Sequence, residues 1–100
     1  MSRRVTAAEF PEATAQGLVL ADFYSDSCVP CKRIAPLLAE LEEEGHFTLL
    51  KVNIAYEPEL TEQYDILGAP TLVFFRDGAE FARLHGFQTK DAILDTIHTA

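Results

Sequence analysis

Two cysteines three residues apart, Cys28 and Cys31, are the residues best suited to chemistry in this chain. They lie between an apolar run, Leu18–Tyr24, and a stretch with apolar residues at helical spacing. At the start of a helix, residues three apart share a face, so the two sulfurs can form a bridge. Unpaired N–H groups and the helix dipole would stabilise a thiolate on Cys28, and the thiolate is the reactive species in thiol–disulfide exchange.

A zinc site and a structural disulfide are the competing interpretations of this cysteine pair. Zinc usually needs four ligands, and the other candidates, His46, His85 and His98, show no paired spacing. A structural disulfide across one helical turn would close too short a loop to stabilise the fold much, and cytosolic reductants would oppose it. We therefore interpret the pair as catalytic, with no metal and no cofactor other than the redox-active disulfide itself.

Length and charge limit the classes of function. One hundred residues, 48% of them apolar, predict a single globular domain over residues 1–100. The formal net charge of −8 would repel nucleic acid and anionic lipid, and it favours solubility. No signal-peptide core is visible near the N-terminus, and the longest apolar run is too short to span a bilayer. We expect a soluble, cytoplasmic monomer.

The first half of the chain is expected to place a helix before a strand–helix–strand unit. Thr6 and Glu9 form a capping-box pattern that predicts a helix from Thr6 to about Gln16, with a break possible at Pro11 and a stop at Gly17. Strands are predicted at Leu18–Tyr24 and Phe47–Ile54. The helix between them starts near Cys31, contains Pro36 and stops at Gly45, and the two strands should pair in parallel.

The second half is expected to end in a hairpin and a helix. Pro58 begins a short helix that reaches about Tyr64, and Thr71–Arg76 is a strand. Asp77-Gly78 predicts a two-residue turn into a strand at Glu80–Leu84, and Thr89 caps the last helix. These elements predict an α/β fold, with a central mixed sheet of four to five strands flanked by helices on both faces.

With these elements in place, the chain resembles the thioredoxin family over practically its whole length. The order and spacing of several landmarks match together, which is far more specific than any single motif. The landmarks are Asp22-Phe23-Tyr24, Cys28-Val29-Pro30-Cys31-Lys32, Ile34-Ala35-Pro36, Lys51-Val52-Asn53-Ile54, Gly68-Ala69-Pro70-Thr71, Asp77-Gly78 and Gly86.

The resemblance implies a thioredoxin fold and a reductase of protein disulfides. Cys28 would be the attacking nucleophile and Cys31 the buried resolving cysteine. Asp22 would be the buried carboxylate behind the dithiol, with Lys51 beside it. The partners implied are protein disulfide substrates and a thioredoxin reductase, linked to NADPH or to ferredoxin.

The resemblance also implies a surface that docks substrates around the dithiol. Pro70 would be a cis-proline facing the cysteines, which leaves the backbone of Ala69 free to pair with an extended substrate. Gly86 would belong to the flat part of this surface, and Val29 and Pro30 would lie beside the nucleophile.

Asp22 and Lys51 also have a physical interpretation of their own. Asp22 interrupts an apolar strand, and burial would raise the pKa of its carboxyl. Such a group could exchange a proton with Cys31 through water. Lys51 could lower the pKa of Asp22 by its charge, or it could be an ordinary exposed lysine of a strand.

Three residues depart from the family pattern: Ser27 and Tyr24 stand where tryptophan is usual, and Val29 stands where glycine is usual. Two alternatives therefore stay open beside the reductase. One is a disulfide oxidase or isomerase, although such relatives usually carry a histidine between the cysteines. The other is a redox-gated binding module, since Ser27 removes an aromatic cover from the dithiol.

Overall fold

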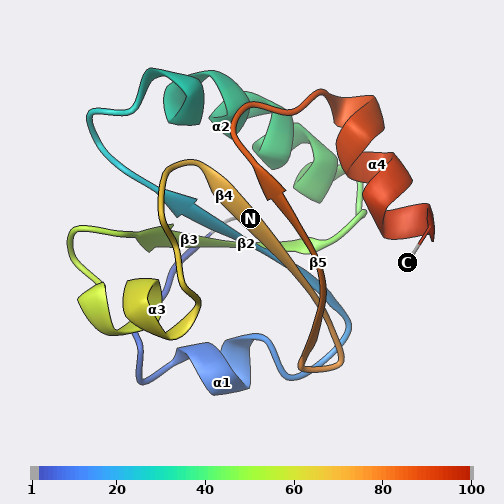
Figure 1. The fold of residues 1–100 in the computed structure, drawn as a ribbon. Coiled ribbons are helices and arrows are strands. Elements are labelled where there is room, and N and C mark those ends of the chain that lie inside the picture. The colour runs from blue at the N-terminus through green and yellow to red at the C-terminus, as the bar shows by residue number, and fades with distance from the viewer. Residues whose placement is uncertain (1–2, 100) are drawn as a thin grey trace.

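A computed structural model describes residues 3–99, and its centre is a five-stranded mixed sheet with the strand order β1-β3-β2-β4-β5 (Figure 1). The central strand β2 (Leu18–Tyr24) is parallel to β3 and antiparallel to β4. The predicted α/β class and mixed sheet are confirmed. The other strands are β1 (Arg3–Arg4), β3 (Thr48–Asn53), β4 (Thr71–Arg76) and β5 (Ala79–His85), and the helices are α1 (Phe10–Ala13), α2 (Val29–Glu43), α3 (Pro58–Gln63) and α4 (Lys90–Thr99).

The helices cover both faces of the sheet, with α1 and α3 on one side and α2 and α4 on the other (Figure 1). Successive residues of β2 point to opposite faces, so Val19 and Ala21 join the core under α1 and α3 while Leu20 joins the core under α2 and α4. This explains why β2 is apolar at nearly every position. Within residues 3–99, no helix has the length and apolar content that a membrane crossing requires.

The ends of α2 and the β4–β5 turn follow the sequence signals. Gly45 has a φ of 86°, and the N–H of His46 donates to the carbonyl of Leu41 at 3.1 Å, which closes the helix with a glycine-dependent cap. Asp77 and Gly78 both have positive φ, 49° and 89°. This is the backbone of the two-residue hairpin turns that match strand twist, so the predicted hairpin is confirmed.

The predicted helix from Thr6 to Gln16 is wrong, because α1 spans only Phe10–Ala13. Glu9 does reach back to the N–H of Thr6, at 3.0 Å, but this contact closes a turn before the helix. Starting the helix at Phe10 places Pro11 in its first turn, where a missing N–H costs no intrahelical bond. Thr14 ends it by donating its hydroxyl to the carbonyl of Phe10, three residues before Gly17.

Candidate active site

The two cysteines lie at the junction between β2 and α2, and they are joined by a disulfide with a Cα–Cα distance of 5.2 Å. Cys28 is the N-cap residue of α2, with an extended backbone, and Sγ of Cys28 accepts the N–H of Cys31 at 3.1 Å. The sulfur thus takes the place that a serine or aspartate oxygen takes in an ordinary N-cap. In the dithiol form this N–H and the helix dipole would stabilise a thiolate on Cys28.

The two sulfurs differ in how far solvent reaches them. Cys28 is half-buried, while Cys31, in the first turn of α2, is only 4% exposed. Val29 and Pro30, between them, are exposed. A bulky disulfide can therefore approach Cys28 but not Cys31.

The loop before β4 lies against the reactive cysteine. Sγ of Cys28 is 3.5 Å from the carbonyl oxygen of Ala69, and the Ala69–Pro70 peptide bond is cis, as the resemblance implied. The N–H of Gly86 donates to the carbonyl of Pro70 at 2.8 Å. The structure therefore brings together Ala69, Pro70 and Gly86, three residues that lie far from the cysteines in the sequence.

Asp22 and Lys51 form an ion pair between the neighbouring strands β2 and β3. They face each other across the parallel β2–β3 pairing, Asp22 is fully buried, and Nζ of Lys51 lies 3.0 Å from Oδ2 of Asp22. Burial raises the pKa of Asp22, and the charge of Lys51 opposes that rise without cancelling it. Lys51 is thus no ordinary exposed lysine: its side chain is 21% exposed, and its Nζ lies 4.6 Å from the ring centre of Tyr24.

A depression of about 180 Å³ reaches from Lys51 of this pair to the buried cysteine. Cys31 and Lys51 both line it, together with Tyr24 and Asp26. The space is large enough for water molecules. Oδ1 of Asp22 is buried and has no hydrogen-bond partner among residues 3–99, so this oxygen is chemically able to accept a proton.

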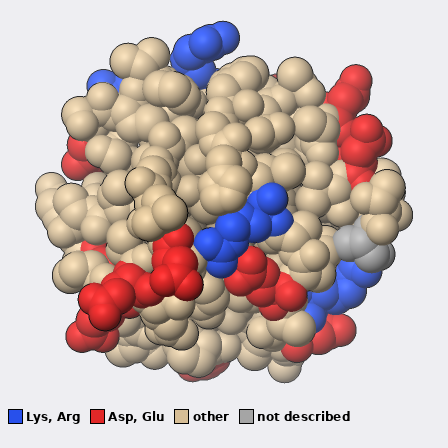
Figure 2. All heavy atoms as spheres, in the orientation of Figure 1, with Lys and Arg blue, Asp and Glu red and all other residues tan. Residues whose placement is uncertain are grey.

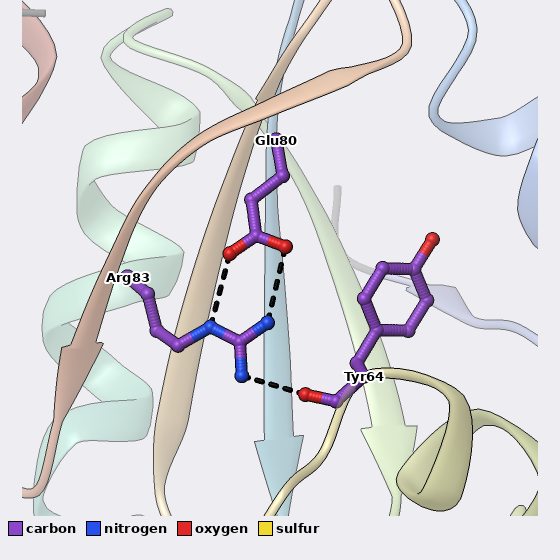
Figure 3. Close-up of polar contacts among 3 residues, drawn as sticks. All are labelled: Tyr64, Glu80 and Arg83. Carbon is purple, nitrogen blue, oxygen red and sulfur yellow. Dashed lines mark hydrogen bonds and ion pairs between the residues drawn. The ribbon is translucent and has the colours of Figure 1, made fainter.

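An arginine clamp fixes the start of the loop that carries Ala69 and Pro70. Arg83 of β5 donates to the carbonyl of Tyr64 at 2.6 Å and makes two 3.0 Å contacts with the carboxylate of Glu80 (Figure 3). Tyr64 is the C-cap residue of α3, where carbonyl groups lack intrahelical partners. Arg83 supplies the missing donor and ties the end of α3 to the edge strand.

We expect Arg83→Met to lower the free energy of unfolding by about 1–2 kcal/mol, because it leaves the half-buried carbonyl of Tyr64 without its donor. The matched variant Glu80→Gln leaves that donor in place and should cost less than about 1 kcal/mol. Guanidinium denaturation with an unchanged m-value measures both. An equal loss in the two variants would show that the ion pair, not the carbonyl, is what Arg83 contributes.

Three features around this site are visible only in the structure. They are the contact of Lys51 with Tyr24, the clamp of Arg83 on Tyr64, and the guanidinium of Arg33 4.8 Å from the ring centre of Phe87. Each joins residues on different elements, so no local pattern could reveal it. Among residues 3–99, no group of three or more His, Cys, Asp or Glu side chains could hold a metal ion.

Comparison with known proteins identifies one family throughout. The family model described as Thioredoxin matches residues 2–99. The chain is 41% identical to a thioredoxin of Chlamydia trachomatis serovar D over 98 residues, which cover 97% of this chain and 96% of the relative. It is 35% identical to a thioredoxin of Staphylococcus aureus over 96 residues, which cover 94% and 92% of the two chains.

Solved structures give the same result. A mutant thioredoxin from Halobacterium salinarum superposes with a TM-score of 0.91 at 32% identity, covering 98% of this chain and 88% of the other. Plasmodium falciparum thioredoxin superposes with a TM-score of 0.85 at 31% identity, covering 97% of both chains. The chain and these proteins therefore share one fold over practically their whole lengths.

Proposed function

The chain belongs to the thioredoxin family and is a thiol–disulfide oxidoreductase, and from that premise we propose that it reduces protein disulfides, with Cys28 as nucleophile and Cys31 as resolving cysteine. The observation that carries the proposal is the unequal placement of the two sulfurs. Cys28 is half-buried at the N-cap of α2, where it accepts an N–H, and Cys31 is buried beneath it.

The reaction runs in two exchange steps. The thiolate of Cys28 attacks one sulfur of the substrate disulfide, the substrate S–S bond breaks, and the thiolate that leaves takes up a proton. Cys31 then loses its proton and attacks Sγ of Cys28. The mixed disulfide breaks, the second substrate thiol leaves, and the Cys28–Cys31 disulfide forms, so two electrons have passed to the substrate.

Asp22 supports the second step of this reaction. Its raised pKa makes it a stronger base for the proton of Cys31 than an ordinary aspartate, and the depression lined by Cys31 and Lys51 offers water a place to relay that proton. Lys51 pairs with the carboxylate of Asp22 from the solvent side. The ring of Tyr24 stabilises the positive charge of Lys51 by a cation–π contact.

Ala69, Pro70 and Gly86 would position the substrate. The carbonyl of Ala69 lies beside Sγ of Cys28, so an extended chain that pairs with this carbonyl brings its disulfide to the nucleophile. Val29 and Pro30 are exposed next to that path and would contact the substrate as it docks. Because the Cys28–Cys31 pair itself carries the two electrons, this reaction needs no bound cofactor in the chain.

Thioredoxins in general act on protein disulfides and are reduced by a thioredoxin reductase, and we propose the same cycle here. Two electrons from NADPH or from ferredoxin would restore the dithiol through such a reductase. The cycle needs a compartment in which dithiols stay reduced, and we therefore place the protein in the cytoplasm.

Reduction of insulin disulfides with dithiothreitol as the electron donor tests the reductase. The wild-type protein should accelerate the reaction well above the rate of dithiothreitol alone. Cys28→Ser should fall to that background, because serine cannot form a disulfide with the substrate. A wild-type rate no higher than that of Cys28→Ser would contradict the proposed function.

A further inference from the structure

Arg33 is a cation on α2 that has no ionic partner among residues 3–99. It lies exposed on α2, five residues after Cys28, and makes no hydrogen bond or ion pair with any of residues 3–99. Its neighbour Lys32 lines the depression that Asp26 also lines. Glu40, two turns further along α2, is already engaged by Lys90. In a chain with twice as many acidic as basic residues, this leaves Arg33 open to an anion from outside.

The side chain of Arg33 is nevertheless held in place. Its guanidinium carbon lies 4.8 Å from the ring centre of Phe87, which is 37% exposed. A guanidinium stacked on an aromatic ring keeps its N–H donors in the plane of the group and directed outward. It can therefore meet a carboxylate in the two-bond geometry without first being ordered.

A series of contacts connects Arg33 to the dithiol. Phe87 follows Gly86, whose N–H is bonded to the carbonyl of Pro70, and the loop of Pro70 touches Cys28 through Ala69. Val29, one helical turn before Arg33 on the same face of α2, is 65% exposed. We call Val29, Arg33 and Phe87 together the Arg33 shelf.

The distribution of charge on the face of the molecule drawn in Figure 2 is compatible with an anionic ligand at the Arg33 shelf. Figure 2 shows acidic side chains gathered over α3 and around α4. Over the start of α2 and the β5–α4 connection, the same face is covered mostly by uncharged side chains. A carboxylate would therefore meet less repulsion near the shelf than over most of this surface.

We propose that the Arg33 shelf binds a carboxylate of the disulfide substrate, so that the preferred substrates carry an aspartate or glutamate close to the disulfide. This deepens the proposed reductase function and rests on it. The five residues from Cys28 to Arg33 span about 7–8 Å along the helix. An extended peptide covers that distance in about two to three residues. The acidic residue should therefore stand two or three positions from the attacked cysteine.

The test compares matched peptide disulfides that carry glutamate or glutamine two or three residues before or after the attacked cysteine. The readout is the ratio of kcat/KM for the glutamate peptide to that for the glutamine peptide. For wild-type protein at low salt we expect a ratio of about two to five at one or more positions, the size of a single exposed ion pair. Adding salt should lower this ratio.

Arg33→Gln should bring the ratio to about one while glutamine peptides are still reduced at the wild-type rate. Arg76→Gln is the matched control, because Arg76 also lies over an aromatic ring, 4.9 Å from the centre of Phe81, but on another part of the molecule. It should keep the wild-type ratio. A wild-type ratio of one at every position, or an unchanged ratio in Arg33→Gln, would overturn the shelf and leave the reductase standing. No reduction of any peptide would overturn both.

Discussion

Replacing Cys31 with serine is expected to turn the protein into a covalent trap, in which substrates stay attached to Cys28 as mixed disulfides. The reason is geometric: Cys28 is the sulfur that solvent reaches, and Cys31 is the buried sulfur that would release the substrate. Without the second thiol, turnover should fall by about a hundredfold or more, since an outside thiol must replace a neighbour held on the same helical turn.

Mass spectrometry of the Cys31→Ser protein, after incubation with a mixture of proteins that contain disulfides, measures the trapped species. Cys28→Ser is the matched control and should trap nothing, because Cys31 is buried. Equal trapping by both variants would contradict the assignment of nucleophile and resolving cysteine. One non-covalent partner, retained equally by Cys28→Ser, would favour the redox-gated binding module instead.

Asp22→Asn is expected to raise the free energy of unfolding of the oxidised protein by about 1–3 kcal/mol at neutral pH. Asp22 is fully buried, and burying a carboxylate costs more than one attraction to Lys51 returns, as the raised pKa of Asp22 indicates. The substitution does not strand a buried charge. The side chain of Lys51 is 21% exposed and keeps its contact with the ring of Tyr24.

The gain in stability should depend on pH in a direction set by the pKa of Asp22. Because burial raises that pKa in the folded protein, the folded state favours the protonated acid. The stability that protonated Asp22 provides is complete below the pKa of an unfolded aspartate, and it is lost as pH rises through the raised folded value. The advantage of Asp22→Asn should therefore be small in acid, grow across this interval and then level off.

Guanidinium denaturation of oxidised wild type and Asp22→Asn across this pH range measures the effect, since disulfide-bonded cysteines do not titrate. Lys51→Met is the opposing variant: it leaves Asp22 without its counter-charge and should lower stability above the folded pKa. A constant difference between wild type and Asp22→Asn at all pH values would show that ionisation of Asp22 is not the cause.

Much of the fold could be predicted because its elements carry strong local signals. β2 and β4 have the predicted limits, since both are apolar runs bounded by polar or turn residues. The predicted limits of the first helix were wrong because the capping pattern at Thr6 competes with Pro11, and the proline determines where the helix can start. β1 is only Arg3–Arg4, too short for any periodicity, and it forms by pairing with β3.

The site was predictable where the residues themselves carry the chemistry, and not where it depends on register. The cysteine pair and its place at the start of α2 follow from the sequence. The family resemblance implied that Lys51 lies beside Asp22, but spacing alone does not determine the parallel register of β2 and β3 that makes them partners. The contact of Arg33 with Phe87 joins α2 to the residue after Gly86, and only the packed structure shows it.

The reduction potential of the Cys28–Cys31 couple tests the central claim most directly, because it determines which way electrons flow. To measure this potential, the protein is equilibrated with defined ratios of reduced and oxidised dithiothreitol. Free thiols are then alkylated, and mass spectrometry gives the fraction of reduced protein at each ratio. A reductant of protein disulfides should have a potential more negative than about −220 mV, within or below the range of cytosolic glutathione. A more positive potential would contradict the claim and identify the protein as a disulfide oxidase or isomerase.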